Sequence, residues 1–493
     1  MENDRWKIEH VPSMRDRVFN PIPYVARYCL PAATAAGVLA SALLCSQGSY
    51  IEAASILTAS VGLGLIVSVR VPLEAVMIFW FAATPFASYY LRFPAEKSIL
   101  TFDRAVFGLA LVLLIIDCRR SGREMFSSKF EIAWALLSAI ALSSAIISSN
   151  NIGYATRIAV DSFWLPLLAF HIARHHIDLR GKASAFILAT MALALVLFFT
   201  GAYELRTGTD LFNYPGSQLV REGELRVNGP FMSDSSYSVI CLILGLFLWA
   251  SPSIFRVRLD GGGRLAHRLA VGAVTIAALL PLFRAVALAM IICWAMMLRL
   301  MTGERRVTAP QRSARLAALA LSVLAILASF TLLATRYSGG RVTDLRNAVG
   351  RLATWESAAE IALENPVFGV GMANYIDYFE AKYLRGGPGR GAVLEVRAAN
   401  TPHSNLLWIA AELGMVAFVL YLAANVYILR MGLSALGRAA TFDRRAAAGC
   451  FLALVAAYWI PGLTLSSGVY SDLNLYLFFL LGLLSGGVSR ASD

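Results

Sequence analysis

Three polar side chains stand beside long apolar stretches of the sequence and could do chemistry there: Arg226, Arg284 and His403. Arginine is suited to a two-point grip on phosphate oxygens, because its planar guanidinium presents a fork of N–H donors. Histidine titrates near neutrality and can accept or donate a proton. Together these residue types indicate a site that holds an anionic group and moves a proton.

His403 follows Thr401 and Pro402 at the start of a long apolar stretch, and two more long apolar stretches follow it in the sequence. Thr401 is a suitable N-cap and Pro402 a suitable first helical residue, which predicts that His403 lies in the first turn of a helix. The positive end of a helix favours anions and disfavours protonation of a nearby histidine. The alternative is a capping or interface histidine with no part in chemistry.

Arg284 interrupts the apolar run from residue 269 to residue 298, which is too long for one bilayer crossing. We expect a tight outward hairpin with Arg284 at or just below the membrane surface. An arginine at the midplane costs roughly 2.5 to 3.5 kcal/mol and usually lines a cavity, whereas one at a helix end can extend to water. Arg226 precedes another apolar run. The alternative interpretation of Arg226 is that it is a solvated loop residue with no part in chemistry.

Other polar residues give weaker predictions. Arg157 and Asp161, four residues apart, are expected to form an ion pair within the membrane, and Glu412 to neutralise or bond a neighbouring helix. Gly369 and Gly371 form a weak GxG pattern that we assign a structural role. There is no HExxH, Walker or DxD motif in the long loops, so the sequence predicts no metal site and no cofactor.

The elements that must position these residues are membrane helices. The chain has 493 residues, of which 58% are hydrophobic and 15% charged, and about fourteen apolar stretches are long enough to be candidate spans. The sequence thus predicts an all-α integral membrane protein with about 12 to 14 transmembrane helices. We divide it into residues 1–200, which are N-terminal spans, and residues 201–490, which contain the proposed site.

The net charge of +12 fits this topology. Most lysines and arginines fall in the tails and loops that we assign to the cytoplasm, which is the positive-inside bias, and an even number of spans places both termini there. The basic residues therefore indicate orientation in the membrane, not a nucleic-acid partner. The six cysteines lie within or beside predicted spans and indicate no disulfide.

Two long loops then face outward, over residues 203–233 and 336–402. In the second, apolar residues recur every three or four positions, which predicts an amphipathic helix from Thr343 to Glu364 that ends before Asn365 and Pro366. Of the six histidines, only His403 is expected on the outward side. The working surface of the protein is therefore predicted on these two loops.

Three segments resemble one family. Pro402 to Tyr421 (PHSNLLWIAAELGMVAFVLY) resembles the His-Asn/Ser, then Glu-x-Gly, signature of the O-antigen ligase and polymerase superfamily of bacterial membrane glycosyltransferases. Arg351 to Gly371 resembles its Arg, Trp and NPxxGxG stretch, and Arg226 to Phe231 (RVNGPF) its Arg-x-x-Gly-x-Phe element. Arg284 lies where that superfamily has a hairpin with a Ser-Arg-Gly-like sequence. The resemblance covers roughly residues 200 to 480.

This resemblance implies an inner-membrane enzyme that works without metal or nucleotide at the periplasmic face. It would transfer a glycan from an undecaprenyl diphosphate carrier to a sugar hydroxyl, for example on lipid A-core. Arg226 and Arg284 would stabilise the charge that develops on the diphosphate, and His403 would act as general base. Arg351 and Arg221 are further candidates for substrate contact.

Two alternatives stay open. A ligase attaches finished polysaccharide to its acceptor, whereas an O-antigen or exopolysaccharide polymerase joins repeat units on the carrier, and both need the same grip on a diphosphate. A transporter or flippase for lipid-linked sugars is the rival from another class. It predicts inverted repeats and helices broken near the midplane, which the sequence does not display.

Overall fold

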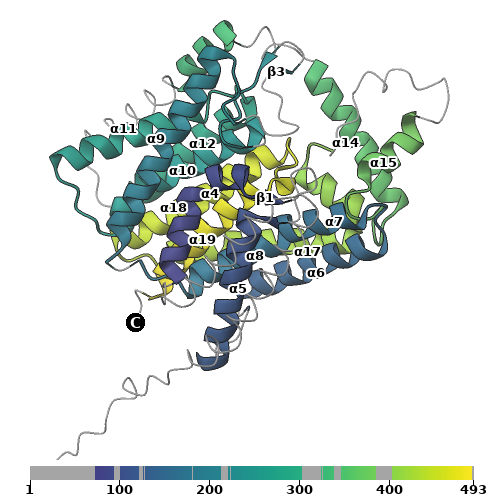
Figure 1. The fold of residues 1–493 in the computed structure, drawn as a ribbon, viewed down its shortest axis with the longest axis horizontal. Helices are drawn as coiled ribbons and strands as arrows, with labels where there is room; N and C mark the ends of the chain where they lie inside the picture. The colour runs from purple at the N-terminus through teal and green to yellow at the C-terminus, as the bar shows by residue number, and fades with distance from the viewer. Residues whose placement is uncertain are drawn as a thin grey trace, which may run out of the picture. The chain divides into compact units, whose positions relative to one another are not determined.

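The computed structural model describes residues 73–93, 100–121, 126, 128–179, 181–212, 220–221, 224–231, 233–302, 324, 326–337, 346–384 and 402–490. Within these residues almost all regular structure is helical (Figure 1). The predicted all-α class is confirmed. The candidate spans among residues 1–72 lie outside the described residues.

The helices fall into three groups along the chain. The first group is α4 (Leu73–Tyr90), α5 (Phe102–Ser121), α6 (Lys129–Ile147), α7 (Ile152–Ala159), the π-helix η3 (Val160–Trp164), α8 (Leu165–His175) and α9 (Ala183–Thr207). The second is α10 (Asp234–Ile254), α11 (Gly261–Ala277) and α12 (Arg284–Thr302). The third is α14 (Arg346–Glu364), α15 (Tyr375–Phe379), the π-helix η4 (Glu380–Leu384), α17 (Asn405–Gly437), α18 (Phe442–Gly462), the 3-10 helix η5 (Ser467–Val469) and α19 (Ser471–Arg490).

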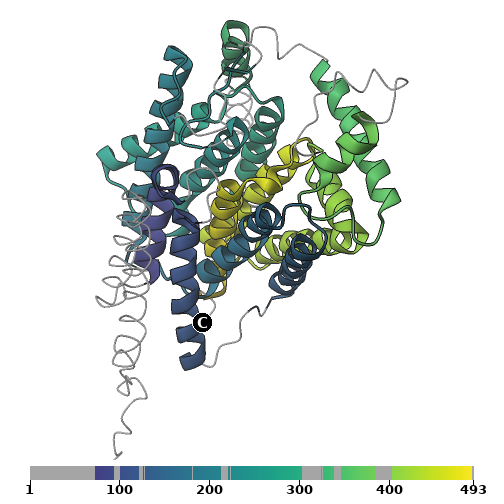
Figure 2. The same cartoon turned by 45° about the vertical axis from the view of Figure 1, so that its right-hand side comes forward.

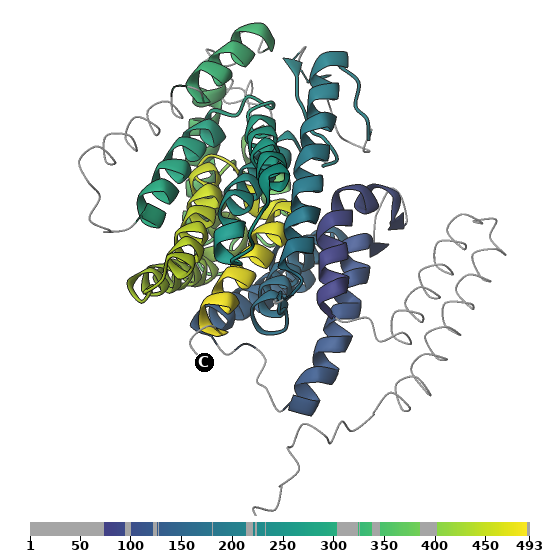
Figure 3. The same ribbon diagram turned by 90° about the vertical axis from the view of Figure 1, so that its left-hand side faces the viewer.

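The described residues also contain two antiparallel ladders, each of two-residue strands. β1 (Arg92–Phe93) pairs with β2 (Leu100–Thr101), and β3 (Val220–Arg221) pairs with β4 (Glu224–Leu225). The second ladder follows the long helix α9 and lies near its end (Figure 3). It lies within the first long loop that the sequence predicts.

Five of the described helices are long and apolar enough to cross a membrane: α6, α9, α10, α17 and α18. Two shorter apolar segments, 73–87 in α4 and 471–486 in α19, add to them. The chain is a membrane protein, as its composition predicts. The side of the membrane on which each loop lies stays a prediction.

α19 lies among the other helices, packed against α8, α10 and α18. Figure 1 shows it, in yellow, in the middle of the bundle. Aromatic side chains fill the space between α19 and α4: the Trp80 ring lies 5.8 Å from Tyr476 and 5.4 Å from Phe479, measured between ring centroids. Such edge and tilted ring contacts add to the dispersion energy of the core. Because α6 also packs on α17, helices from the first 200 residues and from the last 100 share one core.

The predicted ion pair between Arg157 and Asp161 is wrong. Asp161 accepts a hydrogen bond of 2.8 Å from Arg104 Nε, and Arg157 lies over the Tyr154 ring, 5.0 Å from its centroid. Residues Val160–Trp164 form a π-helix, so the turn that carries Asp161 is wider than an α-helical turn. Asp161 consequently pairs with α5 and not with the preceding turn of its own helix.

The predicted amphipathic helix is confirmed, since α14 ends at Glu364 as expected. The predicted break in the run 269–298 is also confirmed: α11 ends at Ala277 and α12 begins at Arg284. The two helices do not form a packed hairpin, however. α11 packs on α9 and α10, while α12 packs on α18.

Candidate active site

Arg226 is held at the first turn of α10. Its Nη1 lies 3.6 Å from Asp234 Oδ2, and the two side chains are 17% and 12% exposed. Arg226 Nε is also buried, and it has no hydrogen-bond partner among the described residues. A buried guanidinium N–H without a partner is costly, so this donor is suited to an anionic ligand.

The segment after Arg226 is fixed by a buried carboxylate near the end of α9. Glu204 Oε2 accepts hydrogen bonds from the backbone N–H groups of Asn228 (3.0 Å) and Gly229 (2.8 Å). Glu204 itself is completely buried. Because a buried carboxylate needs such donors, α9 holds the loop in one conformation and thereby positions Arg226.

Arg284 begins α12, and its side chain is exposed. The turn before it is attached to α10, since Ser238 Oγ donates a hydrogen bond of 2.5 Å to the Ala278 carbonyl. Ser238 lies one helical turn beyond Asp234, the partner of Arg226. The two predicted phosphate-binding arginines therefore both come from segments bound to the start of α10.

His403 lies just before α17 and not in its first turn. The helix begins at Asn405, its N-cap residue is Ser404, and His403 has a φ angle of +50°. The prediction of Thr401 as N-cap and Pro402 as first helical residue is thus wrong, and Thr401 itself lies outside the described residues. A left-handed residue cannot continue a right-handed helix, so His403 is directed by loop geometry and not by the helical periodicity.

The turn before α19 holds this segment. Ser404 N–H donates to Ser466 Oγ (3.1 Å), and Asn405 Nδ2 donates to Ser467 Oγ (2.8 Å). A few residues further on, Asp472 Oδ1 accepts a hydrogen bond of 3.1 Å from Ser236 Oγ in the first turn of α10. The segment of His403 is therefore bound to the connection before α19, and the start of α10, which pairs with Arg226, is bound to the first turn of α19.

α14 brings Arg351 toward the same segment. The Trp355 indole N–H lies 3.4 Å from the His403 carbonyl and donates to it, and Arg351 is one turn before Trp355 on the same face of the helix. The Arg351 side chain is half-buried. Figure 2 shows α14 and α15, in green, beside the yellow-green α17. Arg221 lies in β3, and the structure does not describe its side chain.

Gly369, Gly371 and Glu412 meet where the loop after α14 crosses α17. Val370 N–H donates to the Ala411 carbonyl (2.9 Å), Gly371 N–H donates to the Glu412 carbonyl (3.0 Å), and the Glu412 carboxylate accepts from Ala373 N–H (2.8 Å). A side-chain carbon on Gly369 would lie 2.4 Å from the Glu412 backbone. The loop is thus joined to α17 by backbone groups and by the Glu412 carboxylate.

Gly414 makes this crossing possible. It has a φ angle of +79° within α17, and a Cβ there would lie 2.3 Å from the Val367 carbonyl oxygen. Replacing Gly414 by alanine should destabilise the folded protein by on the order of 3 kcal/mol, because both the strain and the clash oppose it. Thermal unfolding of detergent-solubilised protein would measure this effect.

Gly437, at the end of the same helix, is the matched control, because a Cβ there would meet nothing within 4 Å. We expect Gly437→Ala to leave the unfolding midpoint unchanged or slightly raised. Equal midpoints for Gly414→Ala and Gly437→Ala would contradict the role assigned to Gly414.

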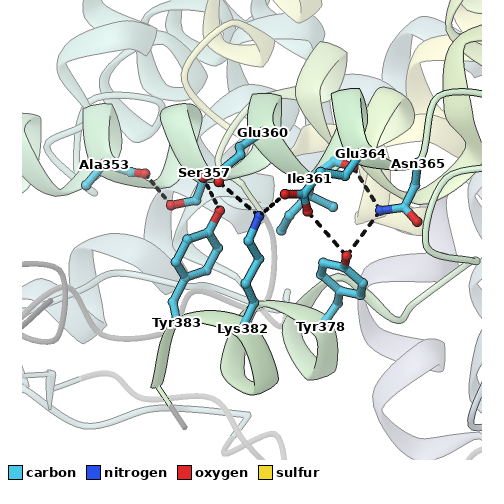
Figure 4. A network of polar contacts seen from close by, with 9 residues as sticks. All are labelled: Ala353, Ser357, Glu360, Ile361, Glu364, Asn365, Tyr378, Lys382 and Tyr383. Atoms are coloured by element: carbon cyan, nitrogen blue, oxygen red, sulfur yellow. Dashed lines mark hydrogen bonds and ion pairs between the residues drawn. The ribbon is translucent and has the colours of Figure 1, made fainter. Parts of the chain in front are cut away.

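A polar network joins α14 to the helical segment α15–η4 (Figure 4). Lys382 Nζ lies 3.0 Å from Glu360 Oε1 and 2.6 Å from Glu364 Oε1, and the Tyr383 hydroxyl donates to Glu360 Oε2. Burial and, after it, the hydrogen bond to Glu360 raise the pKa of Tyr383 to about 12. Burial alone would lower the pKa of Lys382, but its bonds to Glu364 and Glu360 outweigh this and raise it.

Both shifts mean that the folded state holds these protons more tightly than the unfolded chain does. The stability that they contribute is complete below the unfolded pKa values of about 10 and is lost as the pH rises toward about 12. The thermal unfolding midpoint should therefore fall over this range, and it should fall less in Tyr383→Phe. Identical slopes for the parent and Tyr383→Phe would show that this hydroxyl does not contribute.

The second long loop and the helices around it lie in the part of the chain that matches a known protein family. Residues 269–422 match the family described as O-antigen ligase. No curated protein matches the chain. The O-antigen ligase match includes Arg284, Arg351 and His403, while Arg226 and Arg221 lie outside it.

The match confirms the resemblance that the sequence motifs indicate. It supports an O-antigen ligase- or polymerase-type function, and it indicates a glycosyltransferase-like enzyme acting on lipid-linked glycans. Asp234, Glu204 and the connection before α19 are the parts of the site that sequence reasoning missed. In the sequence, these parts are marked only by a polar or acidic residue within or next to an apolar stretch.

Proposed function

We propose that this protein transfers a glycan from an undecaprenyl-diphosphate-linked donor to an acceptor sugar hydroxyl at the periplasmic face of the bacterial inner membrane. The observation that carries the proposal is that Arg226 and the turn before Arg284 are bound to the start of α10, and the segment of His403 to the turn before α19, with Arg284 and His403 inside the O-antigen ligase match. Lipid A-core is the acceptor that we favour.

The proposed chemistry is a direct displacement at the sugar carbon that bears the diphosphate. His403 accepts the proton of the acceptor hydroxyl as its oxygen bonds to that carbon, and the carbon–oxygen bond to the carrier diphosphate breaks. Arg226, with its buried donor Nε, and Arg284 stabilise the charge on the departing diphosphate. Arg351 and Arg221 contact the substrate. The step needs neither a metal ion nor a nucleotide.

The polysaccharide profile of a deletion strain tests this proposal. Loss of all O-chains from lipopolysaccharide with accumulation of carrier-linked polymer supports the ligase. Cores that carry a single repeat unit would show an O-antigen polymerase, and unchanged lipopolysaccharide with loss of secreted polymer would show an exopolysaccharide enzyme. Unchanged profiles of all surface polysaccharides would contradict the proposal, and carrier-linked units trapped on the cytoplasmic side would indicate a flippase.

The proposed topology places both termini in the cytoplasm and the start of α12 outside. A cysteine at position 284 should then react with a membrane-impermeant maleimide added from the periplasm. The parent protein is the control, because it measures the labelling of the six native cysteines, of which those at 241, 293 and 450 are buried and Cys118 is partly exposed. Labelling of Arg284→Cys only after the inner membrane is opened would place this turn on the cytoplasmic side and overturn the assignment of Arg284.

A further inference from the structure

A cluster of three potential metal ligands lies on α6 and α8, apart from the proposed active site. Glu131 is in the first turn of α6, and His171 and His175 are one turn apart on α8. Glu131 Oε1 lies 2.8 Å from His171 Nδ1 and 3.4 Å from His175 Nε2. One ligand atom from each of the three residues lies within 4.8 Å of the other two.

These distances suit a small transition-metal ion. Zinc binds imidazole nitrogen and carboxylate oxygen at about 2.0 to 2.2 Å, so neighbouring ligand atoms in a tetrahedral site are about 3.4 Å apart. Two histidines four residues apart on one helix, with a carboxylate from a second element, form a common three-ligand set that leaves one position for water. The spacing in this cluster needs little adjustment to reach that arrangement.

The burial of the three side chains also favours a metal site. The Glu131 and His171 side chains are 0% and 1% exposed, while His175 is 29% exposed. Nδ1 is the His171 nitrogen that faces Glu131, and Nε2 on the other side of the ring is buried and has no hydrogen-bond partner among the described residues. Burying a carboxylate beside two imidazoles is costly unless positive charge neutralises it, and the nearest fixed positive charge, Arg174, is 3.8 Å away on the side of Oε2. The His175 side chain is partly exposed, but its Nε2 is buried and has no hydrogen-bond partner among the described residues.

The surrounding residues orient the carboxylate. Ser128 donates from its backbone N–H (2.9 Å) and its hydroxyl (2.6 Å) to Glu131 Oε2, which turns Oε1 toward the histidines. Arg174 Nη1 lies 3.8 Å from Oε2, and the His176 ring lies 5.7 Å from the His171 ring. The positive charge of Arg174 opposes any cation, and the two imidazole ligands favour a transition-metal ion over magnesium or calcium.

We propose that Glu131, His171 and His175 bind one divalent transition-metal ion of the zinc class. The ion joins the start of α6 to the end of α8. Ser144, thirteen residues beyond Glu131 on α6, accepts the Met372 N–H of the loop that crosses α17. At 1.5 Å per residue, the cluster lies roughly 20 Å from that loop, so the ion has a structural role and no part in glycan transfer.

Cobalt binding to the purified full-length protein in detergent tests this site. After treatment with a chelator, Co²⁺ should bind at one ion per chain with the visible absorption of tetrahedral coordination, and Zn²⁺ should displace it. His175→Ala should lose this band and weaken binding at least tenfold. Metal should also raise the unfolding midpoint of the parent protein but not that of His175→Ala.

His267→Gln is the matched control, because His267 is a buried histidine whose ring nitrogen bonds to the Leu248 carbonyl on α10. It should bind Co²⁺ as the parent does. His175 is partly exposed, so its substitution should preserve the fold, and Glu131→Gln provides a second variant of nearly the same shape. No tetrahedral Co²⁺ in the parent, or equal binding by the parent and His175→Ala, would overturn the proposal.

Discussion

Replacing His403 by alanine should reduce glycan transfer by about 10² to 10⁴-fold, the usual contribution of a general base. The protein should stay folded in the membrane, because the contacts of this segment that involve Ser404 N–H and the His403 carbonyl are made by the backbone. The measurement is the initial rate of polymer transfer to acceptor by membranes that contain equal amounts of each protein.

His403→Gln separates basicity from packing, since glutamine keeps a polar side chain but cannot accept a proton near neutrality. It should be as inactive as His403→Ala. Trp355→Phe removes only the hydrogen bond to the His403 carbonyl, and we expect a smaller loss than for either histidine variant. Near-normal transfer by His403→Gln would exclude His403 as the base.

Replacing Arg226 by glutamine should lower the rate by about 10² to 10³-fold, the loss that is typical when a group stabilising transition-state charge is removed. Arg226→Lys should also be poor, since lysine cannot supply two parallel N–H donors to a phosphate. Parallel variants at Arg284 should show the same order of effects. The measurement is again the rate of transfer at matched protein levels.

Asp234→Asn distinguishes a phosphate-binding role of Arg226 from a purely structural ion pair. If Arg226 serves only to pair with Asp234, the two substitutions should be equally harmful. If it binds diphosphate, Asp234→Asn should retain activity within about tenfold while Arg226→Gln does not. Arg256→Gln is the control for loss of an arginine, because its ion pair with Asp443 is exposed on the arginine side and contributes little.

Local patterns explain which features the sequence predicts correctly. The helix from about residue 343 to Glu364 depends on a stripe of apolar residues and on Asn365 and Pro366, all within one segment. The break before Arg284 follows from bilayer thickness alone. Neither feature requires knowledge of distant parts of the chain.

The predictions that failed depend on contacts between distant residues. Thr401 and Pro402 fit the statistics of a helix start, but Ser404 is the N-cap, and its backbone is fixed by Ser466, sixty-two residues later in the chain. Asp161 pairs with Arg104, fifty-seven residues away, although Arg157 is four residues away. Local propensity could not find these partners, because tertiary hydrogen bonds and a π-helical turn decide them.

The anchoring role of Glu204 was missed for a similar reason. Its donors are backbone N–H groups of Asn228 and Gly229, which have no side-chain signature in a sequence. The metal-ligand cluster also escapes a motif search, because Glu131 and His171 are forty residues apart and meet only when α6 packs near α8.

The most direct test of the account is the release of undecaprenyl diphosphate by purified protein supplied with a lipid-linked oligosaccharide and an acceptor glycan. The account predicts that the parent protein releases the carrier diphosphate in step with acceptor glycosylation, and that His403→Gln and Arg226→Gln bind the donor but release almost none. Donor binding without any release by the parent, or release that both variants sustain at the parental rate, would contradict it.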